Sequence, residues 1–314
     1  MPHENPVNPP PNETVKRFLE DLAPLVPAIL EGLDTVAVFT QQLRTAAGQV
    51  ASQLEALADD MAPLLAALAQ VDWPAAIRRL EDLPAKSKAA MRLAASNGWF
   101  FGWEDSLLGL MTLVQKLDVV ESDEIDQVMA DYYRENLEFL TVRLVAKHPD
   151  RARAILAAVD AHRALDENGY ILSIPVFIAQ ADGLLTELAE VNSAMMKVSR
   201  NSQELQGSKA LREKLAGDQA ALDLICPILQ LHELDFLKSA KERHETVLTT
   251  GEAFTALNRH QVMHGESLDY GTELNSLKAF SFLAFVGTHL PSVLDSYNRK
   301  PVKKPIALTD DLSY

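Results

Sequence analysis

The stretch GYILSIPVFIAQADGLLTEL, residues 169–188, decides between two fold classes. Its first half is rich in β-branched and aromatic side chains, which is typical of a buried strand. The second half, from Gln180 onward, favours a helix. One helix from about Tyr170, with Pro175 in an early turn or at a kink, accounts for the whole stretch. Because residues 150–298 contain no run of alternating β-branched residues, the sequence predicts an all-α fold.

Outward from this helix, the pattern divides the chain into regions. Residues 150–298 predict a bundle of about four further helices, with a polar loop and a short helix over residues 199–218. Residues 98–149 predict a helical connecting region that ends at His148-Pro149, because a residue before proline disfavours the helical conformation. The aromatic cluster at residues 99–103 predicts a plug between helical layers. Asp72-Trp73-Pro74, Leu83-Pro84 and Asn97-Gly98 indicate turns or helix boundaries.

The N-terminal part has a different period. Apolar residues recur every seventh position, and a second register follows four residues after the first. This pattern predicts long helices with coiled-coil seams over residues 15–97, which pair either between chains or as a hairpin within one chain. Amphipathic helices that cover a core remain an alternative. The first register is Val15, Leu22, Ile29, Val36, Leu43, Val50, Leu57 and Leu64.

Composition sets the class of protein. The 314 residues include 29 Lys+Arg and 44 Asp+Glu, which gives a formal net charge of −15 and argues against a general nucleic-acid coat. The single cysteine, Cys226, excludes an intramolecular disulfide and a cysteine-based zinc site. No uninterrupted apolar run reaches membrane-spanning length, and residues 1–14 read as a disordered proline-rich tail rather than a secretory signal. Residues 299–314 form a basic and polar tail, and we expect a cytoplasmic protein without a membrane partner.

One segment, LNRHQVMHG at residues 257–265, concentrates groups suited to phosphodiester chemistry. Arg259 can bind a phosphate with two hydrogen bonds, and His260 and His264 can exchange protons near neutral pH. Residues 249–252 resemble a helix N-terminus, and Gly265 suits a helix C-terminus. On an ideal helix His260 and His264 lie about 40° apart, whereas Arg259 and His264 diverge by about 140°. Cooperation of Arg259 with His264 therefore needs a loosened helix end or a second protomer.

This segment resembles the HEPN superfamily, whose hallmark is an arginine, a polar residue and then a histidine. Arg259, His260 and His264 fit that pattern, and the flanking HG-x4-YGT-x2-NSLKA is similar to an uncharacterised bacterial branch of these helical proteins. The stretch that begins at Gly169 looks like the early helix of that branch. The resemblance covers roughly residues 150–295. Arg143 and His148 have the same spacing, but the residue after Arg143 is apolar.

The resemblance implies a helical bundle that pairs as a homodimer or higher homo-oligomer. It implies a metal-independent endoribonuclease that needs no cofactor, in a toxin–antitoxin or phage-defence setting, with RNA as substrate and an antitoxin protein as partner. His264 would then transfer protons and Arg259 would stabilise the phosphorane, with His260 and Asn258 in support. The expected product carries a 2′,3′-cyclic phosphate.

Two alternatives remain open on the residues alone. The first is a noncatalytic interaction or regulatory module that homo-oligomerises, in which Arg259 pairs with a carboxylate such as Asp182 or Glu266. The second is a metal shared by His260, His264 and a carboxylate such as Glu266. No companion carboxylate–histidine motif supports the second, so we assign no metal site.

Overall fold

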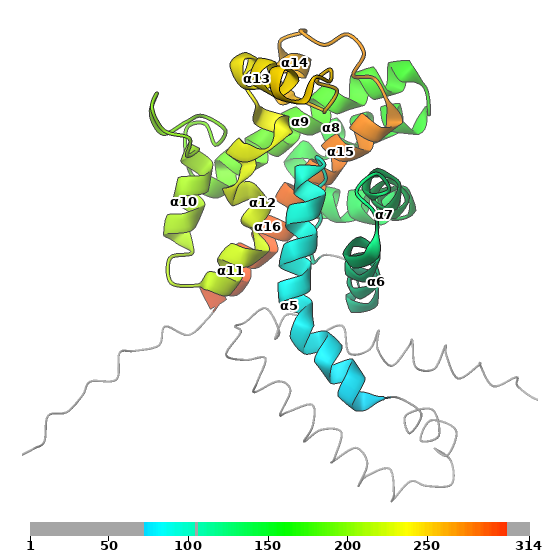
Figure 1. Ribbon diagram of the computed structural model, residues 1–314, viewed down its shortest axis with the longest axis vertical. Coiled ribbons are helices and arrows are strands. Elements are labelled where there is room, and N and C mark those ends of the chain that lie inside the picture. The colour runs from blue at the N-terminus through cyan, green and yellow to red at the C-terminus, as the bar shows by residue number, and fades with distance from the viewer. Residues whose placement is uncertain (1–71, 104–105, 300–314) are drawn as a thin grey trace, which may run out of the picture.

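The computed structural model describes residues 72–103 and 106–299, and these residues form an all-α fold (Figure 1). The predictions for residues 1–14, 15–71 and 300–314 lie outside the described residues. Within the described ranges, the only β pairing is one bridge between Lys197 and Leu205. The helices are α5 (Trp73–Ser96), α6 (Leu107–Val119), α7 (Ile125–Lys147), α8 (Ala152–Arg163), α9 (Glu167–Ala189), α10 (Gln206–Lys214), α11 (Gln219–Leu224), α12 (Cys226–Leu229), α13 (Ala240–Thr250), α14 (Arg259–Met263), α15 (Glu273–Ala284) and α16 (Leu290–Arg299).

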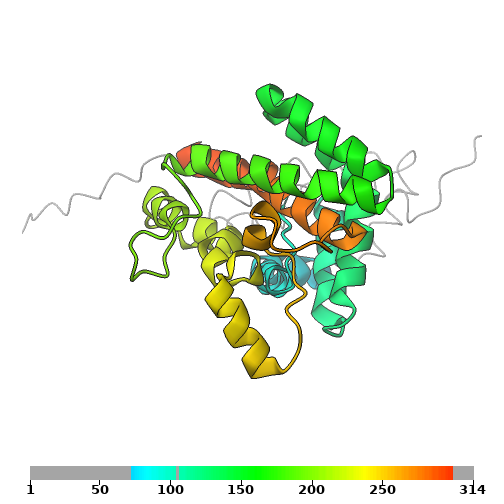
Figure 2. The same ribbon diagram turned by 90° about the horizontal axis from the view of Figure 1, so that it is seen from above.

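The stretch that begins at Gly169 forms one helix, α9, which confirms the prediction. The Asp166 side chain caps the start of α9 by accepting a hydrogen bond from the Gly169 N–H at 2.7 Å. Pro175 stands inside the helix, and α9 ends at Glu190, which has a left-handed φ of 56°. The helix packs against α8 and α15, its two most extensive neighbours, and α8 lies at the edge of the bundle (Figure 2). Its buried apolar residues are Tyr170, Ile174, Phe177, Ile178, Ala181, Leu184, Leu185 and Ala189.

One hydrophobic core runs from α5 to α16 and is continuous across residue 149, where the sequence pattern divides a connecting region from a bundle. The aromatic cluster of residues 99–103 is buried, as expected of a plug between helices. Trp99 donates its indole N–H to Asp126 at 2.7 Å, and its ring stacks on Tyr133 of α7. The connecting region therefore belongs to the same core as the helices that follow it.

Two expected helix boundaries are wrong. Pro84 lies inside α5, since the helix continues from Trp73 to Ser96. Residues 249–252 are the end of α13 rather than a helix start, and Gly251 has a left-handed φ of 75°. A capping box between Ser239 and Glu242 begins this helix further upstream. The bundle also contains more helices after residue 150 than the sequence pattern suggested.

A π-helical turn at Phe285–His289 joins α15 to α16. Side chains from the end of α7 take up its carbonyl groups: His148 Nε2 bonds to the Gly287 oxygen at 2.7 Å, and Lys147 Nζ donates to the Thr288 oxygen at 2.8 Å. A Cβ on Gly287 would lie 2.4 Å from Leu144 Cδ2, so the two helices approach closely here. His148, which with Arg143 forms the second Arg–His pair of this spacing in the sequence, thus has a structural role.

Among the residues that the structure describes, two helices reach the length and hydropathy of a membrane span. They are Glu167–Ala189 and Glu273–Asn298, and 39% and 78% of their most apolar windows are buried inside the protein. Helices at the centre of a water-soluble core meet the same criterion, so the observation is weak evidence for a membrane.

We expect Gly169→Ala to destabilise the fold by about 1–3 kcal/mol, because overpacking a rigid contact is costly. A Cβ at this position would lie 2.1 Å from the backbone oxygen of Ala161 on α8. Urea unfolding measures the effect. Gly183→Ala is the matched control in the same helix, since its nearest neighbour at 3.0 Å is the flexible Arg151 side chain. Equal stability of the two variants would contradict the packing of α8 on α9.

A buried polar chain links α8, α9 and α15. His162 is 3% exposed, its Nδ1 bonds to Ser276 Oγ at 2.8 Å, and Ser276 Oγ bonds to Ser173 Oγ at 2.7 Å. Burial lowers the pKa of His162, and the positive charges of Arg134 and Arg163 act in the same direction, against the Glu273 carboxylate. The His162 side chain is therefore held in its neutral form.

We expect this histidine to make the fold acid-sensitive. Because the pKa of His162 is lower in the folded state, the unfolded chain binds more protons as the pH falls below about 6.5. Stability then falls with pH, with a slope from this group of at most about 1.4 kcal/mol per pH unit. Urea unfolding between pH 7 and pH 5 should show a smaller slope for His162→Gln, whereas the exposed His244→Gln should leave it unchanged.

Candidate functional site

The predicted site residues lie on and around α14, a five-residue helix at one end of the bundle, next to α13 (Figure 1). Asn258 is the N-cap, and its side-chain oxygen accepts a hydrogen bond from the Gln261 N–H at 3.1 Å. The helix ends at His264, and Gly265 follows with a left-handed φ of 70°, which confirms the expected helix end. Arg259 and His260 thus occupy the first turn and His264 the loosened last position.

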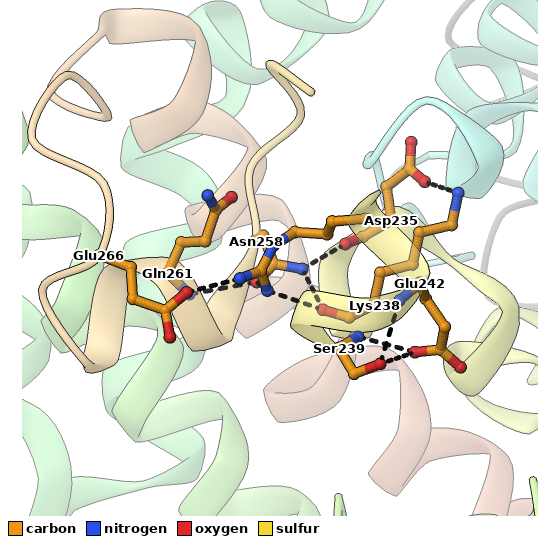
Figure 3. A network of polar contacts seen from close by, with 8 residues as sticks. Asp235, Lys238, Ser239, Glu242, Asn258, Gln261 and Glu266 are labelled. Carbon is orange, nitrogen blue, oxygen red and sulfur yellow. Dashed lines mark hydrogen bonds and ion pairs between the residues drawn. The ribbon is translucent and has the colours of Figure 1, made fainter. Parts of the chain in front are cut away.

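Asn258 is the anchor of this helix. Its side chain is 1% exposed, and its Nδ2 donates to the backbone oxygens of Asp235 at 2.7 Å and Lys238 at 2.9 Å (Figure 3). With Oδ1 on Gln261 N–H, the amide satisfies donors and acceptors on both sides. The supporting role expected for Asn258 is therefore positional: it ties the start of α14 to the segment before α13.

Arg243 of α13 holds both ends of the short helix. The residue is only 8% exposed. Its Nη1 donates to Asn258 Oδ1 at 3.1 Å and to the Lys238 oxygen at 3.0 Å. Nη2 donates to the carboxylate of Glu266, two residues after His264. The guanidinium therefore joins the residue before Arg259 to the loop after His264. The sequence pattern does not single out Arg243, because it lies outside the motif.

Arg259 points toward α9. Its Nη2 donates to Asp182 Oδ2 at 2.7 Å, and the two side chains are 23% and 22% exposed. Of the two carboxylates considered as partners from the sequence, Asp182 is thus the one that pairs with it, while Glu266 pairs with Arg243. Arg259 and Asp182 also line a cavity of about 280 Å³ between α9 and α14.

The two histidines lie together. The ring centroids of His260 and His264 are 6.0 Å apart, and the ring planes are nearly parallel, at 6°. His264 is exposed and His260 is half-buried. Burial lowers the pKa of His260, and the nearby charges of Arg259, His264 and Arg243 lower it further, against Glu266. The pair therefore combines one imidazole held neutral with a second one open to solvent.

The structure brings His260 and His264 together and directs Arg259 elsewhere. Arg259 engages Asp182 on α9, while His264 faces solvent beside His260. This separation follows the divergence of about 140° expected for their spacing on a helix. Arg259 and His264 of one chain point in different directions. A reaction that uses both on one phosphate thus needs another arrangement, such as a second copy of the chain that supplies one of the two side chains.

A larger cavity, of about 710 Å³, lies on the other side of α14. Its lining includes the carboxylates of Asp126, Asp235, Glu266 and Asp269 and one cation, Lys278, which pairs with Asp126 at 2.9 Å. Asp126, Asp235 and Glu266 are paired with Lys278, Lys238 and Arg243, so this lining offers a phosphate no unpaired cation. The two cavities beside α14 therefore differ in the charged groups that they offer to a ligand.

Glu266 does not complete a metal site with the histidines, because its carboxylate bonds to Arg243. Across residues 72–103 and 106–299, no group of three or more His, Cys, Asp or Glu side chains is close enough to share a metal ion. Cys226 is buried, and burial raises the pKa of its thiol, which suits the inert role expected from its apolar neighbours.

Fold and site together define an all-helical protein that carries arginine and two histidines on a short helix, held by a buried polar network. Comparison with known proteins adds no closer identity: no family model, no curated protein and no solved structure matches the chain.

Proposed function

We propose that the protein is a metal-independent endoribonuclease that acts through His264 and Arg259. The observation that carries the proposal is the geometry of α14: a neutral and an exposed imidazole 6.0 Å apart, with a guanidinium on the same five-residue helix. The exposed imidazole of His264 suits proton transfer in a phosphodiester reaction, with the neutral imidazole of His260 in support. Buried hydrogen bonds of Asn258 and Arg243 support the required rigidity.

In the proposed reaction, the ribose 2′-oxygen attacks the adjacent phosphorus while the bond from phosphorus to the 5′-oxygen breaks. His264 exchanges one of the two protons, removing it from the 2′-hydroxyl or delivering it to the leaving 5′-oxygen, and water exchanges the other. His260 supports His264 as its neutral neighbour. Arg259 stabilises the charge on the phosphorane oxygens. The products are a 2′,3′-cyclic phosphate end and a 5′-hydroxyl end.

The proposal includes a homodimer or higher homo-oligomer. Because Arg259 faces α9 and His264 faces solvent, pairing two copies supplies a cleft in which the arginine of one and the histidine of the other meet one phosphate. The net charge of −15 gives no help to RNA binding over the whole surface, so the RNA has to bind in such a local cleft. A toxin–antitoxin or phage-defence setting, with an antitoxin protein as partner and a cytoplasmic location, completes the proposal.

The experiment that tests this proposal uses two RNAs of one sequence in EDTA, one with a 2′-deoxy nucleotide at the mapped cleavage position. We expect the all-ribose strand to be cut and the substituted strand to stay intact at that position, because the nucleophile is missing. Equal cleavage of both strands would contradict attack by the 2′-hydroxyl.

A second candidate function, a noncatalytic interaction or regulatory module, is favoured by the ion pair between Arg259 and Asp182. In this case the pair fixes α14 on α9, and the chain self-associates through residues 15–70. Mass measurement in solution should then show a smaller assembly after deletion of residues 1–70. Arg259→Ala should lower the free energy of unfolding, and neither the wild type nor this variant should cleave RNA. RNA cleavage by the wild type that Arg259→Ala lacks would reject this function.

A further inference from the structure

The cavity of about 280 Å³ between α9 and α14 has a lining suited to an oxyanion. Arg259 supplies the positive charge, and Thr186, Asn192 and Ser193 supply neutral hydroxyl and amide groups from α9 and the loop that follows it. Asp182 is the only carboxylate among the residues that line this cavity. In this respect the cavity differs from the larger one beyond α14, whose lining holds four carboxylates and one lysine.

The hydrogen-bonding state of these groups leaves donors for a ligand. Nη2 of Arg259 is taken by Asp182, whereas Nε is buried and has no hydrogen-bond partner among the described residues. A buried donor without a partner costs about 1–3 kcal/mol, which an acceptor would offset once the Arg259 side chain turns from Asp182 and exposes Nε. The Thr186 hydroxyl accepts a hydrogen bond from the Ala194 N–H at 3.2 Å and keeps its own proton to donate.

We propose that this cavity is a binding subsite for a phosphate group of the RNA strand and that Asp182 is its gate. The proposal rests on the proposed function and adds to it the place of the phosphate and the residue that controls its entry. The phosphate and the Asp182 carboxylate compete for the same guanidinium, since both are oxyanions that bind Arg259 through its N–H groups. Entry of the phosphate exchanges one ion pair for the other.

Charge explains why Asp182 would limit binding. While Asp182 and Arg259 are paired, their charges cancel, and an incoming phosphate meets a neutral pair in a protein of net charge −15. An asparagine at position 182 keeps the shape and a hydrogen bond but leaves the Arg259 charge uncompensated. Removing one negative charge beside a half-buried guanidinium is expected to tighten phosphate binding by about fivefold to tenfold.

The test measures binding of a 2′-O-methylated oligouridylate, which lacks the attacking hydroxyl, by fluorescence anisotropy at low salt. We expect Asp182→Asn to bind about fivefold to tenfold more tightly than the wild type. Asp160→Asn on α8 makes the same change of charge at an exposed position, and we expect less than a twofold gain from it. Adding Arg259→Gln to Asp182→Asn should abolish the gain, and Ser193→Ala alone should weaken binding about twofold.

Two results would overturn the inference. One is a gain from Asp182→Asn no larger than that from Asp160→Asn, with circular dichroism matching the wild type. The other is a gain that persists in the double variant with Arg259→Gln. If Asp182→Asn does not fold, unchanged binding by Ser193→Ala overturns it instead. Because the probe cannot be cleaved, its binding is measured apart from the reaction. A protein that shows the Asp182 and Arg259 effects on binding but never cleaves RNA would refute the nuclease and leave the subsite.

Discussion

Replacement of His264 by alanine is expected to lower the rate of RNA cleavage by about 10²–10⁴-fold while the fold survives. A positioned acid or base contributes this much to a proton-transfer step. His264 is exposed, and its ring contacts His260 rather than the core, so its removal leaves the packing of the bundle intact. Initial rates on labelled RNA in EDTA, with circular dichroism as the folding check, measure the effect.

The matched control for this variant is His244→Ala. His244 is exposed on α13, the helix beside α14, and lies outside the Arg–His motif. We expect it to cleave within about twofold of the wild type. Equal rates for wild type, His244→Ala and His264→Ala would show that the cleavage comes from another site or from a contaminant.

Replacement of Arg243 by alanine should have the largest effect on the shape of the site. It removes one of the two donors to Asn258 Oδ1 and one of the two donors to the Lys238 oxygen, and it removes the partner of Glu266. Because Glu266 is 45% exposed, we expect a loss of about 2–3 kcal/mol in the free energy of unfolding rather than the full cost of a broken buried ion pair. Urea unfolding measures it. Arg243→Lys should lie between, since a lysine keeps the charge but loses the planar fork.

The control for Arg243 is Lys241→Ala on the same helix. Lys241 is 85% exposed and pairs with Glu245 at 3.6 Å, so we expect a change of less than about 0.5 kcal/mol. Arg243→Ala should also impair cleavage under conditions where the variant is folded, because α14 is no longer held at both ends. A variant as stable and as active as Lys241→Ala would contradict the clamping role of Arg243.

Local signals predicted those parts of the fold that depend on neighbours in the chain. Asn97-Gly98 ends α5, Gly265 follows α14 in the left-handed conformation, and the strand-like residues after Gly169 continue into one helix. In each case a glycine, a proline or the apolar pattern determines the conformation of residues close to it in the chain. The pairing of Arg259 with Asp182 was also anticipated, as one of two carboxylate partners.

Features that depend on distant contacts could not be predicted in this way. Pro84 is tolerated inside α5 although proline removes a helical hydrogen bond, and tertiary packing of the helix overrides that local cost. Arg243 carries no motif, and its role arises only because α13 packs beside Asn258 and Glu266. The π-helical turn at Phe285–His289 depends on carbonyl partners at the end of α7, far upstream in the chain.

The electrostatics of the candidate site show the same division. The presence of Arg259, His260 and His264 within six residues could be read directly, and so could their divergence on a helix. The lowered pKa of His260 could be read only in part, from the neighbouring Arg259 and His264, because its largest cause is burial and Arg243 on another helix adds to it. Nor could the contrast between the two cavities, whose linings combine residues from the whole chain.

Mass spectrometry of the RNA fragments formed by the wild-type protein in EDTA tests the central claim most directly, because it identifies the bond that breaks. The account predicts fragments that end in a 2′,3′-cyclic phosphate, paired with fragments that begin with a 5′-hydroxyl. Intact RNA, or fragments that carry a 5′-phosphate and a 3′-hydroxyl, would contradict it.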